Sequence, residues 1–392
     1  MARTSGGSRI VIILVVCCVL AAAASGVLFF NKPPQVENVI LISFDDLRTD
    51  RLGCYGNKRD VSPFLDKLAR EGSQFMRAFT SWPFTPPSHV SLLTSLYPQV
   101  FNLPLDPKVN TLAKVLAEHG FITAAFTGGG FMSSDYGVFS GFQEYDDSVS
   151  NLGIFSRTIR QWLGSHQNEK FFLFLHTYYV HEPFVAPKKY FQEYANPDYS
   201  GPVFNDPIST MEFIDAANKR RIEVNPEDVQ RILDIYDGQI HRADDFMKQL
   251  VNFLEKIGIL ENTMLVITSD HGEQFFEFGY FAHSAPSRRF PDISTRVPLI
   301  FSCPQFKPKG KIDGMVELID IPPTILDAVG IQIPDAFQGK SLFPLISRKF
   351  HHFFKKKKEI YYTNDGMTGI RTDKYKLTMV DSSGEIQLFD LI

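Results

Sequence analysis

Short apolar runs alternate with amphipathic stretches along most of the chain, and this alternation predicts the fold class. Residues 39–44 and 264–269 are apolar runs, which is typical of strands buried on both faces of a parallel sheet. Residues 62–72 and 226–257 instead place apolar side chains at helical spacing, and each stretch carries a proline near its start. Strands that alternate with helices predict an α/β fold with a mostly parallel central sheet sandwiched by helices.

The same patterns predict further elements along the chain. A helix is expected at residues 111–119, and strands are expected at residues 121–126, 171–177 and 297–302. Residues 195–225 are polar and weakly periodic, and we expect a surface excursion there. After about residue 346, short strands predict a small C-terminal antiparallel subdomain; they lie near Ile360, Gly369, Tyr375 and Ile386.

The first thirty-three residues differ from the rest of the chain. Residues 10–30 carry no charge, and as a helix they would reach about the thickness of the hydrocarbon core of a bilayer. We predict a membrane anchor within residues 1–33, with a cleaved signal peptide as the alternative because Ala21–Ser25 offers small residues for cleavage. In both cases the positive N-terminus predicts that the remaining chain lies on the exported side, periplasmic or extracellular, or is secreted.

The bulk composition narrows the classes of function. The formal net charge is −4 at pH 7, so nothing indicates the basic excess of a nucleic-acid-binding protein, and we expect no nucleic-acid partner. Only Cys54 and Cys303 lie outside the apolar N-terminal run, and two cysteines do not make a disulfide framework. Their pairing stays open.

Acidic and imidazole side chains follow two of the predicted strands. Asp45 and Asp46 come directly after the strand at 39–44, and Asp270 and His271 follow the strand at 264–269. Sites in open α/β sheets lie at the carboxyl ends of the strands, and these side chains are ligands that divalent metals take. Each pair alone is also compatible with an ordinary turn or helix cap.

Thr85 is informative because of the residues that follow it. Pro86 and Pro87 suit the first turn of a helix, so we predict that Thr85 is the N-cap residue. It is then either a plain capping threonine or a nucleophile at a helix N-terminus that favours an anionic substrate. A threonine hydroxyl is a poor nucleophile, so the second interpretation requires a metal. Asp237 and His241, one helical turn apart, have a spacing that also suits a second metal.

Several ordered motifs together resemble the sulfatase family of the alkaline-phosphatase superfamily. Ser43–Gly56 is similar to the first metal motif of that family, and Thr85–Pro98 matches its nucleophile signature. The resemblance runs from about residue 37 to the end of the chain. Its further motifs are His119–Phe126, His181–Phe184, Ser269–Glu273 followed by His283 and Arg296–Leu299, Gly369–Leu377, and Leu388–Leu391.

The resemblance implies a role for each matching residue. A divalent metal (Ca²⁺, Zn²⁺ or Mn²⁺) would be held by five ligands: Asp45, Asp46, Thr85, Asp270 and His271. Thr85 would also attack the ester and form a covalent intermediate. His181 and His283 would contact the ester oxygens or the leaving group, or help to hold a second metal. His89 stands where sulfatases usually have arginine, and it would orient the nucleophile or a substrate oxygen.

Two departures from the sulfatase pattern change the expected chemistry. Sulfatases convert a cysteine or serine into formylglycine, and Thr85 cannot give that aldehyde, so no formylglycine is expected. The lysine-bearing motif of many sulfatases is also absent, because residues 127–132 read Thr-Gly-Gly-Gly-Phe-Met. A threonine nucleophile instead resembles the phosphodiesterases, phosphonate hydrolases and phosphoethanolamine transferases of the superfamily.

We therefore predict a metal-dependent hydrolase of phosphate or sulfate esters, with an anionic ester substrate that is lipid- or glycan-linked. The alternatives are a phosphotransferase at the membrane surface, a formylglycine-independent sulfatase, and an inactive binding module. Residues 34–345 would form the catalytic domain and residues 346–392 the small antiparallel subdomain. Relatives usually continue beyond Leu391, so a truncated C-terminal unit is expected as an open alternative.

Overall fold

The computed structural model describes most of the chain after residue 35. The described residues are 36–98, 104–148, 152–283, 290–306, 309–347, 359–364 and 366–391. The predicted N-terminal anchor, residues 1–33, lies outside them. Among the described residues, no helix combines the length and the apolar character that crossing a membrane requires.

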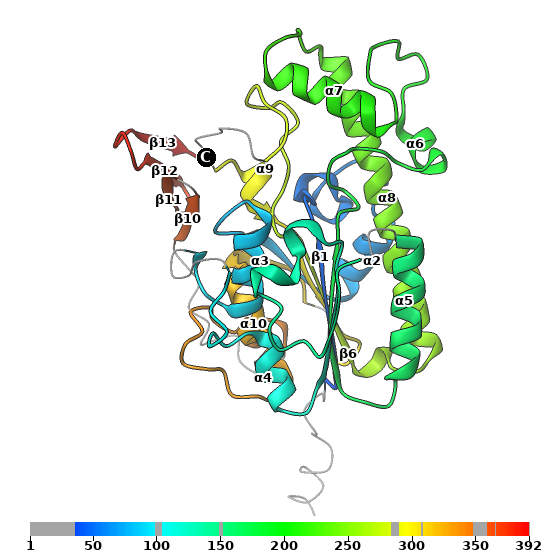
Figure 1. Ribbon diagram of the computed structural model, residues 1–392, viewed down its shortest axis with the longest axis vertical. Helices are drawn as coiled ribbons and strands as arrows, with labels where there is room; N and C mark the ends of the chain where they lie inside the picture. The colour runs from blue at the N-terminus through cyan, green and yellow to red at the C-terminus, as the bar shows by residue number, and fades with distance from the viewer. Residues whose placement is uncertain are drawn as a thin grey trace, which may run out of the picture. The chain divides into compact units, whose positions relative to one another are not determined.

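A nine-stranded sheet forms the centre of the fold (Figure 1). Its strands are β1 (Asn38–Phe44), β2 (Ser73–Phe79), β3 (Ile122–Phe126), β4 (Glu144–Asp146), β5 (Phe171–Thr177), β6 (Thr263–Thr268), β7 (Arg296–Val297), β8 (Leu299–Ser302) and β9 (Gly310–Glu317). They run in the order β4-β3-β5-β1-β6-β8-β2-β7, and β9 also pairs with β2. β1 pairs in parallel with both β5 and β6, so the carboxyl ends of these three strands meet at one edge of the sheet.

Helices cover both faces of this sheet, which confirms the predicted α/β class (Figure 1). One face packs against α2 (Pro63–Glu71), α5 (Leu152–Ser165) and α8 (Pro226–Lys256), and the other packs against α3 (Thr85–Thr94), α4 (Leu112–Glu118) and α10 (Ile321–Ala328). Within β1, Ile40 and Ile42 belong to the first core, and Val39 and Leu41 belong to the second. Because every residue of β1 is buried, the strand is apolar on both faces.

Two predicted segments differ from the structure. The predicted surface excursion at 195–225 contains a regular helix, α7 (Pro207–Asn218). Asp206 caps α7 by accepting hydrogen bonds from the N–H groups of Ile208 and Ser209, and the helix buries Phe213. Most residues of this segment are exposed or half-buried, as expected of a surface excursion, but the weak periodicity did not predict α7, which buries only a narrow stripe. Three shorter helices lie outside this segment: α6 (Lys188–Tyr194), α9 (Asp292–Thr295) and α11 (Phe343–Ile346).

The second difference is at residues 297–302, where one strand was expected and the structure has two. Pro298 separates β7 from β8, because proline has no N–H to donate to a ladder. β8 pairs antiparallel with both β6 and β2. The sheet is therefore mostly parallel on the β1 side and gains antiparallel pairs beyond β6. The apolar patterns do not predict β2 and β9.

The predicted antiparallel subdomain is a separate four-stranded sheet, β10 (Ile360–Asn364), β11 (Met367–Arg371), β12 (Tyr375–Val380) and β13 (Ile386–Asp390). Aromatic rings join it to the large sheet, because the Tyr362 ring stacks on Phe290 with centroids 5.4 Å apart and meets Phe79 edge-on at 6.4 Å. Lys376 adds a buried polar contact by donating to the Phe290 carbonyl oxygen at 2.8 Å.

Replacing Tyr362 with alanine tests this packing. Tyr362 is 1% exposed and fills the space between Phe79 and Phe290, so Tyr362→Ala should lower the free energy of unfolding by about 3–5 kcal/mol. Tyr361→Ala is the matched control, because Tyr361 is 45% exposed on the same strand and should change stability by less than about 0.5 kcal/mol. Urea denaturation measures both, and equal effects would contradict this packing.

Candidate active site

The turn after β1 presents two carboxylates at the carboxyl edge of the sheet. The Asp45 N–H extends the ladder by donating to the Thr177 carbonyl oxygen at 3.0 Å. Asp46 then adopts a left-handed backbone conformation with φ of 66°. Tyr236 of α8 secures this turn, because its hydroxyl donates to the Asp46 carbonyl oxygen at 2.6 Å and accepts from the Arg48 N–H at 3.0 Å. The buried tyrosine thereby holds both carboxylates in place.

Helix α3 brings Thr85 to the same edge. The N-cap residue is Phe84, with φ −157° and ψ 139°, and Thr85 is the first helical residue, so the prediction that Thr85 is the N-cap was wrong by one position. The Thr85 Oγ1 lies 3.3 Å from His271 Nε2 and 3.5 Å from Asp45 Oδ2. The hydroxyl therefore faces the acidic and imidazole groups rather than capping the helix.

The first turn of α3 offers few hydrogen bonds to an anion. Pro86 and Pro87 have no N–H group, and the Ser88 N–H donates to the Phe84 carbonyl oxygen at 3.1 Å. The contribution of the helix N-terminus to anion binding is thus expected to be small. The His271 imidazole, whose Nε2 lies 3.3 Å from the Thr85 Oγ1, is a further group that can interact with an anion.

His89 lies one turn after Thr85 and is completely buried. Its Nδ1 is 2.8 Å from the Thr85 carbonyl oxygen, which can only accept, so Nδ1 carries the proton and Nε2 accepts from the Ser43 hydroxyl at 3.1 Å. Burial, followed by the neighbouring His176, lowers the pKa of His89 to about 3, which keeps the ring neutral. This placement favours orientation of the nucleophile over contact with a substrate oxygen.

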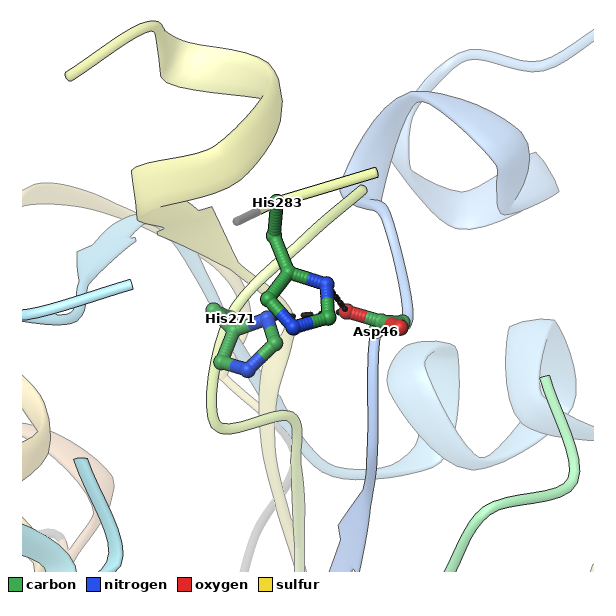
Figure 2. A group of neighbouring side chains, drawn as sticks. All are labelled: Asp46, His271 and His283. Atoms are coloured by element: carbon green, nitrogen blue, oxygen red, sulfur yellow. Dashed lines mark ion pairs between the residues drawn. The ribbon is translucent and has the colours of Figure 1, made fainter. Parts of the chain in front are cut away.

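The loop after β6 supplies Asp270 and His271. His271 Nε2 lies 3.3 Å from Asp270 Oδ2 and 3.7 Å from Asp45 Oδ1, and His271 Nδ1 lies 2.8 Å from Asp46 Oδ1 (Figure 2). A glycine is needed at position 272, since a Cβ there would lie 2.0 Å from the Ile293 carbonyl oxygen. Asp45, Asp46, Thr85, Asp270 and His271, the five ligands that the resemblance implied, therefore lie together.

The predicted imidazoles border Asp46. His181 Nε2 lies 3.5 Å from Asp46 Oδ2, and His283 Nδ1 lies 3.2 Å from Asp46 Oδ1 (Figure 2). Two buried neighbours had no predicted role. His176 Nε2 lies 3.1 Å from Asp45 Oδ2, and Glu273 Oε2 lies 3.3 Å from His283 Nδ1. Both stand beside assigned positions: His176 is in register with Ser43 on the adjacent strand, and Glu273 belongs to the second metal motif.

The donor atoms at this edge fit a divalent cation. Asp45 Oδ1, both carboxylate oxygens of Asp46, and Asp270 Oδ2 are buried without a hydrogen-bond donor among the described residues. A buried carboxylate oxygen without a donor is costly, and a metal ion is the partner that carboxylates and imidazoles share. Three overlapping groups have donor atoms within 4.8 Å of one another: Asp45, Asp270 and His271; Asp45, Asp46 and His181; and Asp46, His271 and His283.

The pKa values at the centre show how its charges oppose one another. Burial would raise the pKa of Asp45, but the His176 hydrogen bond and the His181 charge outweigh it and lower that pKa to about 2. For Asp270, burial and then the Asp45 charge raise the pKa well above its usual value. Burial and Asp46 likewise raise the pKa of Glu273 to about 7. Without a cation, the acids are thus balanced partly by imidazolium groups and partly by bound protons.

The spacing of Asp237 and His241 does not create a second site of this kind. Asp237 accepts from Arg51 at 2.5 Å and from Arg59 at 2.7 Å. His241 lies 2.7 Å from the Tyr194 hydroxyl, so the structure gives both side chains other partners.

Comparisons with known sequences show the family to which this chain belongs. A model of the family described as "Sulfatase" matches residues 37–331, and one described as "N-sulphoglucosamine sulphohydrolase, C-terminal" matches residues 277–392. The dog protein "Arylsulfatase K" is 23% identical over 420 residues, covering 91% of this chain and 77% of the dog protein. "Arylsulfatase" of Clostridium perfringens is 26% identical over 440 residues, and the match covers 90% of this chain and 88% of the Clostridium protein.

Solved structures share the fold. The phosphonate monoester hydrolase of Silicibacter pomeroyi superposes with a TM-score of 0.74 at 19% identity, covering 91% of this chain and 89% of its own. Together the matches define the class, which is that of the ester hydrolases of the sulfatase type with an alkaline-phosphatase fold. Within that class, the chain belongs to the sulfatase family.

Removing the Tyr236 hydroxyl tests whether it holds the metal centre. Tyr236→Phe should lower the free energy of unfolding by about 1–3 kcal/mol, because a buried carbonyl and a buried N–H lose their partner. It should also weaken divalent-cation binding measurably, because Asp46 loses the contact that holds its left-handed turn. Calorimetric titration of the purified protein with Mn²⁺ or Ca²⁺ measures the affinity.

Tyr199→Phe is the matched control. The Tyr199 hydroxyl also accepts from a backbone N–H, that of Val203 at 3.0 Å, and donates to Asp228 at 2.6 Å. Its loss should cost a similar free energy of unfolding and leave cation affinity unchanged. Equal losses of affinity in the two variants would show that Tyr236 acts on overall stability alone.

Proposed function

We propose that this chain is a divalent-metal-dependent hydrolase of sulfate or phosphate esters in which Thr85 is the nucleophile. The observation that carries this proposal is the position of the Thr85 hydroxyl, which faces the Asp45 carboxylate and the His271 imidazole. Around it lie buried carboxylate oxygens that have no hydrogen-bond donor among the described residues. The names of the relatives support both ester types, since they include arylsulfatases and a phosphonate monoester hydrolase. Since Thr85 cannot become formylglycine, the proposal expects none.

The residues that would hold the cation are Asp45, Asp46, Asp270 and His271, with Thr85 as a further ligand. A bound cation would supply Lewis-acid stabilisation and lower the pKa of the Thr85 hydroxyl toward neutrality. The chain itself fixes the donors, because Tyr236 holds the Asp46 turn and His89 donates to the Thr85 carbonyl oxygen.

The chain's own residues account for the chemical steps. The Thr85 hydroxyl loses its proton to the solvent, its oxygen attacks the sulfur or phosphorus atom, the bond to the leaving alcohol breaks, and a covalent Thr85 ester forms. Asp46 and Glu273 surround the His283 Nδ1 and, against the opposing effect of burial, raise its pKa well above its usual value, so that His283 holds a proton. His283 would bind an ester oxygen and protonate the leaving alcohol, and His181, which loses its proton when the cation binds, would accept a proton from the attacking water. Water then breaks the Thr85 ester and releases the inorganic acid.

A centre with two cations is the alternative that a specific observation favours. Asp46 belongs to two groups of possible metal ligands, one that includes His181 and one that includes His283. Neither group is the same as the third, which consists of Asp45, Asp270 and His271. In that arrangement His181 and His283 would be ligands rather than contacts to the ester. Elemental analysis of the purified protein gives the number of metal ions per chain.

Loss of the Thr85 hydroxyl tests the nucleophile. Thr85→Ala should reduce hydrolysis of p-nitrophenyl sulfate, p-nitrophenyl phosphate and p-nitrophenyl phenylphosphonate by about a thousandfold or more, because the attacking oxygen is gone. Thr85→Ser should retain part of the activity. Ser91→Ala is the matched control, since Ser91 is buried on the same helix and should leave the rate nearly unchanged.

Mass spectrometry of quenched reactions completes this test. A sulfuryl or phosphoryl group should appear on the peptide that contains Thr85 and be absent in Thr85→Ala. Activity that persisted in Thr85→Ala would remove Thr85 from the mechanism, and preference among the three substrates shows which ester the enzyme cleaves.

Cation affinity should rise with pH. Burial would lower the pKa of His181, but Asp46 and Asp45 raise it to about 9, so the metal-free protein carries this proton at neutral pH. A cation beside Asp46 repels that proton, so His181 alone should contribute up to about a tenfold rise in affinity per pH unit from pH 6.5 to 9. Competition with a chromophoric chelator measures this slope.

His181→Gln should reduce the slope by one proton. His241→Gln is the control and should leave the slope unchanged, because His241 contacts Tyr194 and Glu193 instead. An unchanged slope in His181→Gln would mean that another group releases the proton.

A further inference from the structure

His176 is a completely buried histidine at the carboxyl end of β5, and the proposed chemical steps do not use it. It belongs to none of the three groups of possible metal ligands found among the described residues. Its Nε2 nevertheless lies 3.1 Å from Asp45 Oδ2, so it contacts one oxygen of a residue that would hold the cation. Such a contact can decide how the carboxylate faces a metal.

The pairing of β1 with β5 holds both partners of this contact. Ser43 is in register with His176, and the Asp45 N–H donates to the Thr177 carbonyl oxygen at 3.0 Å. His176 and Asp45 therefore stand on neighbouring strands whose backbones are hydrogen-bonded at this point. The sheet itself, rather than a loop, sets the distance between the imidazole and the carboxylate.

Two neighbouring rings fix the orientation of the His176 ring. The His89 ring meets it nearly at a right angle with centroids 4.9 Å apart, and the Tyr178 ring does the same at 4.7 Å. Tyr178 is itself held, because its hydroxyl donates to the Gly129 carbonyl oxygen at 2.9 Å. An imidazole packed in this way has little room to rotate away from Asp45.

The surroundings of the two ring nitrogens place the His176 proton on Nε2. Nδ1 is buried and has no hydrogen-bond partner among the described residues, whereas Nε2 faces a carboxylate oxygen. A proton on Nδ1 would be a buried donor without an acceptor, and it would leave the Nε2 lone pair facing the Asp45 carboxylate. His176 Nε2 therefore donates to Asp45 Oδ2.

This hydrogen bond makes the two oxygens of Asp45 different. Oδ2 accepts from His176 and also lies 3.5 Å from Thr85 Oγ1. Oδ1 is buried without a donor among the described residues, and it lies 3.7 Å from His271 Nε2. The bond to Oδ2 keeps the carboxylate from turning, so Oδ1 is the oxygen that is left for a cation.

We propose that His176 is a positioning residue that makes Asp45 present only Oδ1 to the cation and thereby sets which divalent cation the centre prefers. This inference rests on the cation site of the proposed function. Ca²⁺ accepts carboxylates through one oxygen or both in a flexible geometry, whereas Mg²⁺ requires a nearly ideal octahedron. Release of Oδ2 from His176 should therefore shift the preference of the centre toward Ca²⁺.

The variants His176→Met and His176→Gln form a matched pair for testing this role. Methionine and glutamine are unbranched side chains of similar length, but only glutamine can donate an N–H to Asp45. Calorimetric titration of each purified protein with Mg²⁺ and with Ca²⁺ gives the ratio of the two affinities. His176→Met should raise the ratio of Ca²⁺ to Mg²⁺ affinity by about tenfold or more, and His176→Gln should keep it within about threefold of wild type.

Two results of these titrations would overturn the positioning role. A purely structural role for His176 would lower both affinities in parallel, so an unchanged ratio in His176→Met would contradict the proposal. An equal rise of the ratio in both variants would mean that the packing of the imidazole matters and that its N–H does not.

NMR of the wild-type protein tests the same contact without any variant that has to bind metal. Labelling the histidines with ¹⁵N should show a proton on His176 Nε2, both without metal and with Mg²⁺ bound. The His176 signal is assigned by its absence from the spectrum of His176→Gln. A proton on Nδ1 would overturn the proposal, and so would loss of the Nε2 proton when Mg²⁺ binds, because His176 would then be a ligand itself.

None of these measurements uses ester hydrolysis, so the two proposals can fail separately. A cation preference that depends on the His176 N–H, in a protein that cleaves no ester, would support the positioning role although the proposed function had failed. Hydrolysis that depends on Thr85, together with an unchanged cation ratio in His176→Met, would overturn the positioning role alone. A wild-type protein that binds neither cation would also overturn it.

Discussion

The burial of four acidic side chains at one edge of the sheet is the constraint on which the remaining structure depends. Asp45, Asp46, Asp270 and Glu273 are all fully buried. Mutual repulsion and desolvation would expel such a group unless opposite charge were close. Imidazoles supply part of that charge, and the raised pKa values of Asp270 and Glu273 show that protons supply part of the rest. A divalent cation would replace both, which explains why oxygens of Asp45, Asp46 and Asp270 converge without a hydrogen-bond donor among the described residues.

The fold keeps these groups together by securing the loops that carry them. Arg48 links two of these loops, because its guanidinium donates to the Glu273 carbonyl oxygen at 3.1 Å and pairs with Asp50 and Glu277. Tyr236 reaches the Asp46 turn from the long helix α8. The charged centre is thus held by groups outside it that do not touch the reacting position. Since these contacts come from distant parts of the chain, the geometry of the centre depends on the complete sheet and its helices.

Much of this arrangement could be predicted from the sequence, and the exceptions have physical causes. The strand before Asp45 was predictable because it is buried on both faces, and the C-terminal sheet because its strands are short and separated by turns. α7 was missed because it buries only a narrow stripe. His176 was missed because a histidine inside an apolar strand is usually a core residue, and only the pairing of β1 with β5 places it beside Asp45. The first turn of α3 has few N–H groups to offer an anion because it contains two prolines, and the same prolines had predicted that a helix begins there.

The single oxygen of Thr85 constrains how any covalent intermediate could be released. The hydrated aldehyde of formylglycine has two hydroxyls on one carbon, so the free hydroxyl can expel the ester formed on the other. Thr85 has one, so its ester must be cleaved by a second attack on sulfur or phosphorus, and the attacking water must reach a buried site. Thr85 is 1% exposed, whereas the side chain of His181 is 17% exposed. In the proposed mechanism, water would therefore enter on the His181 side, which the leaving alcohol has vacated, and the His181 imidazole, neutral once the cation is bound, would accept a proton from that water.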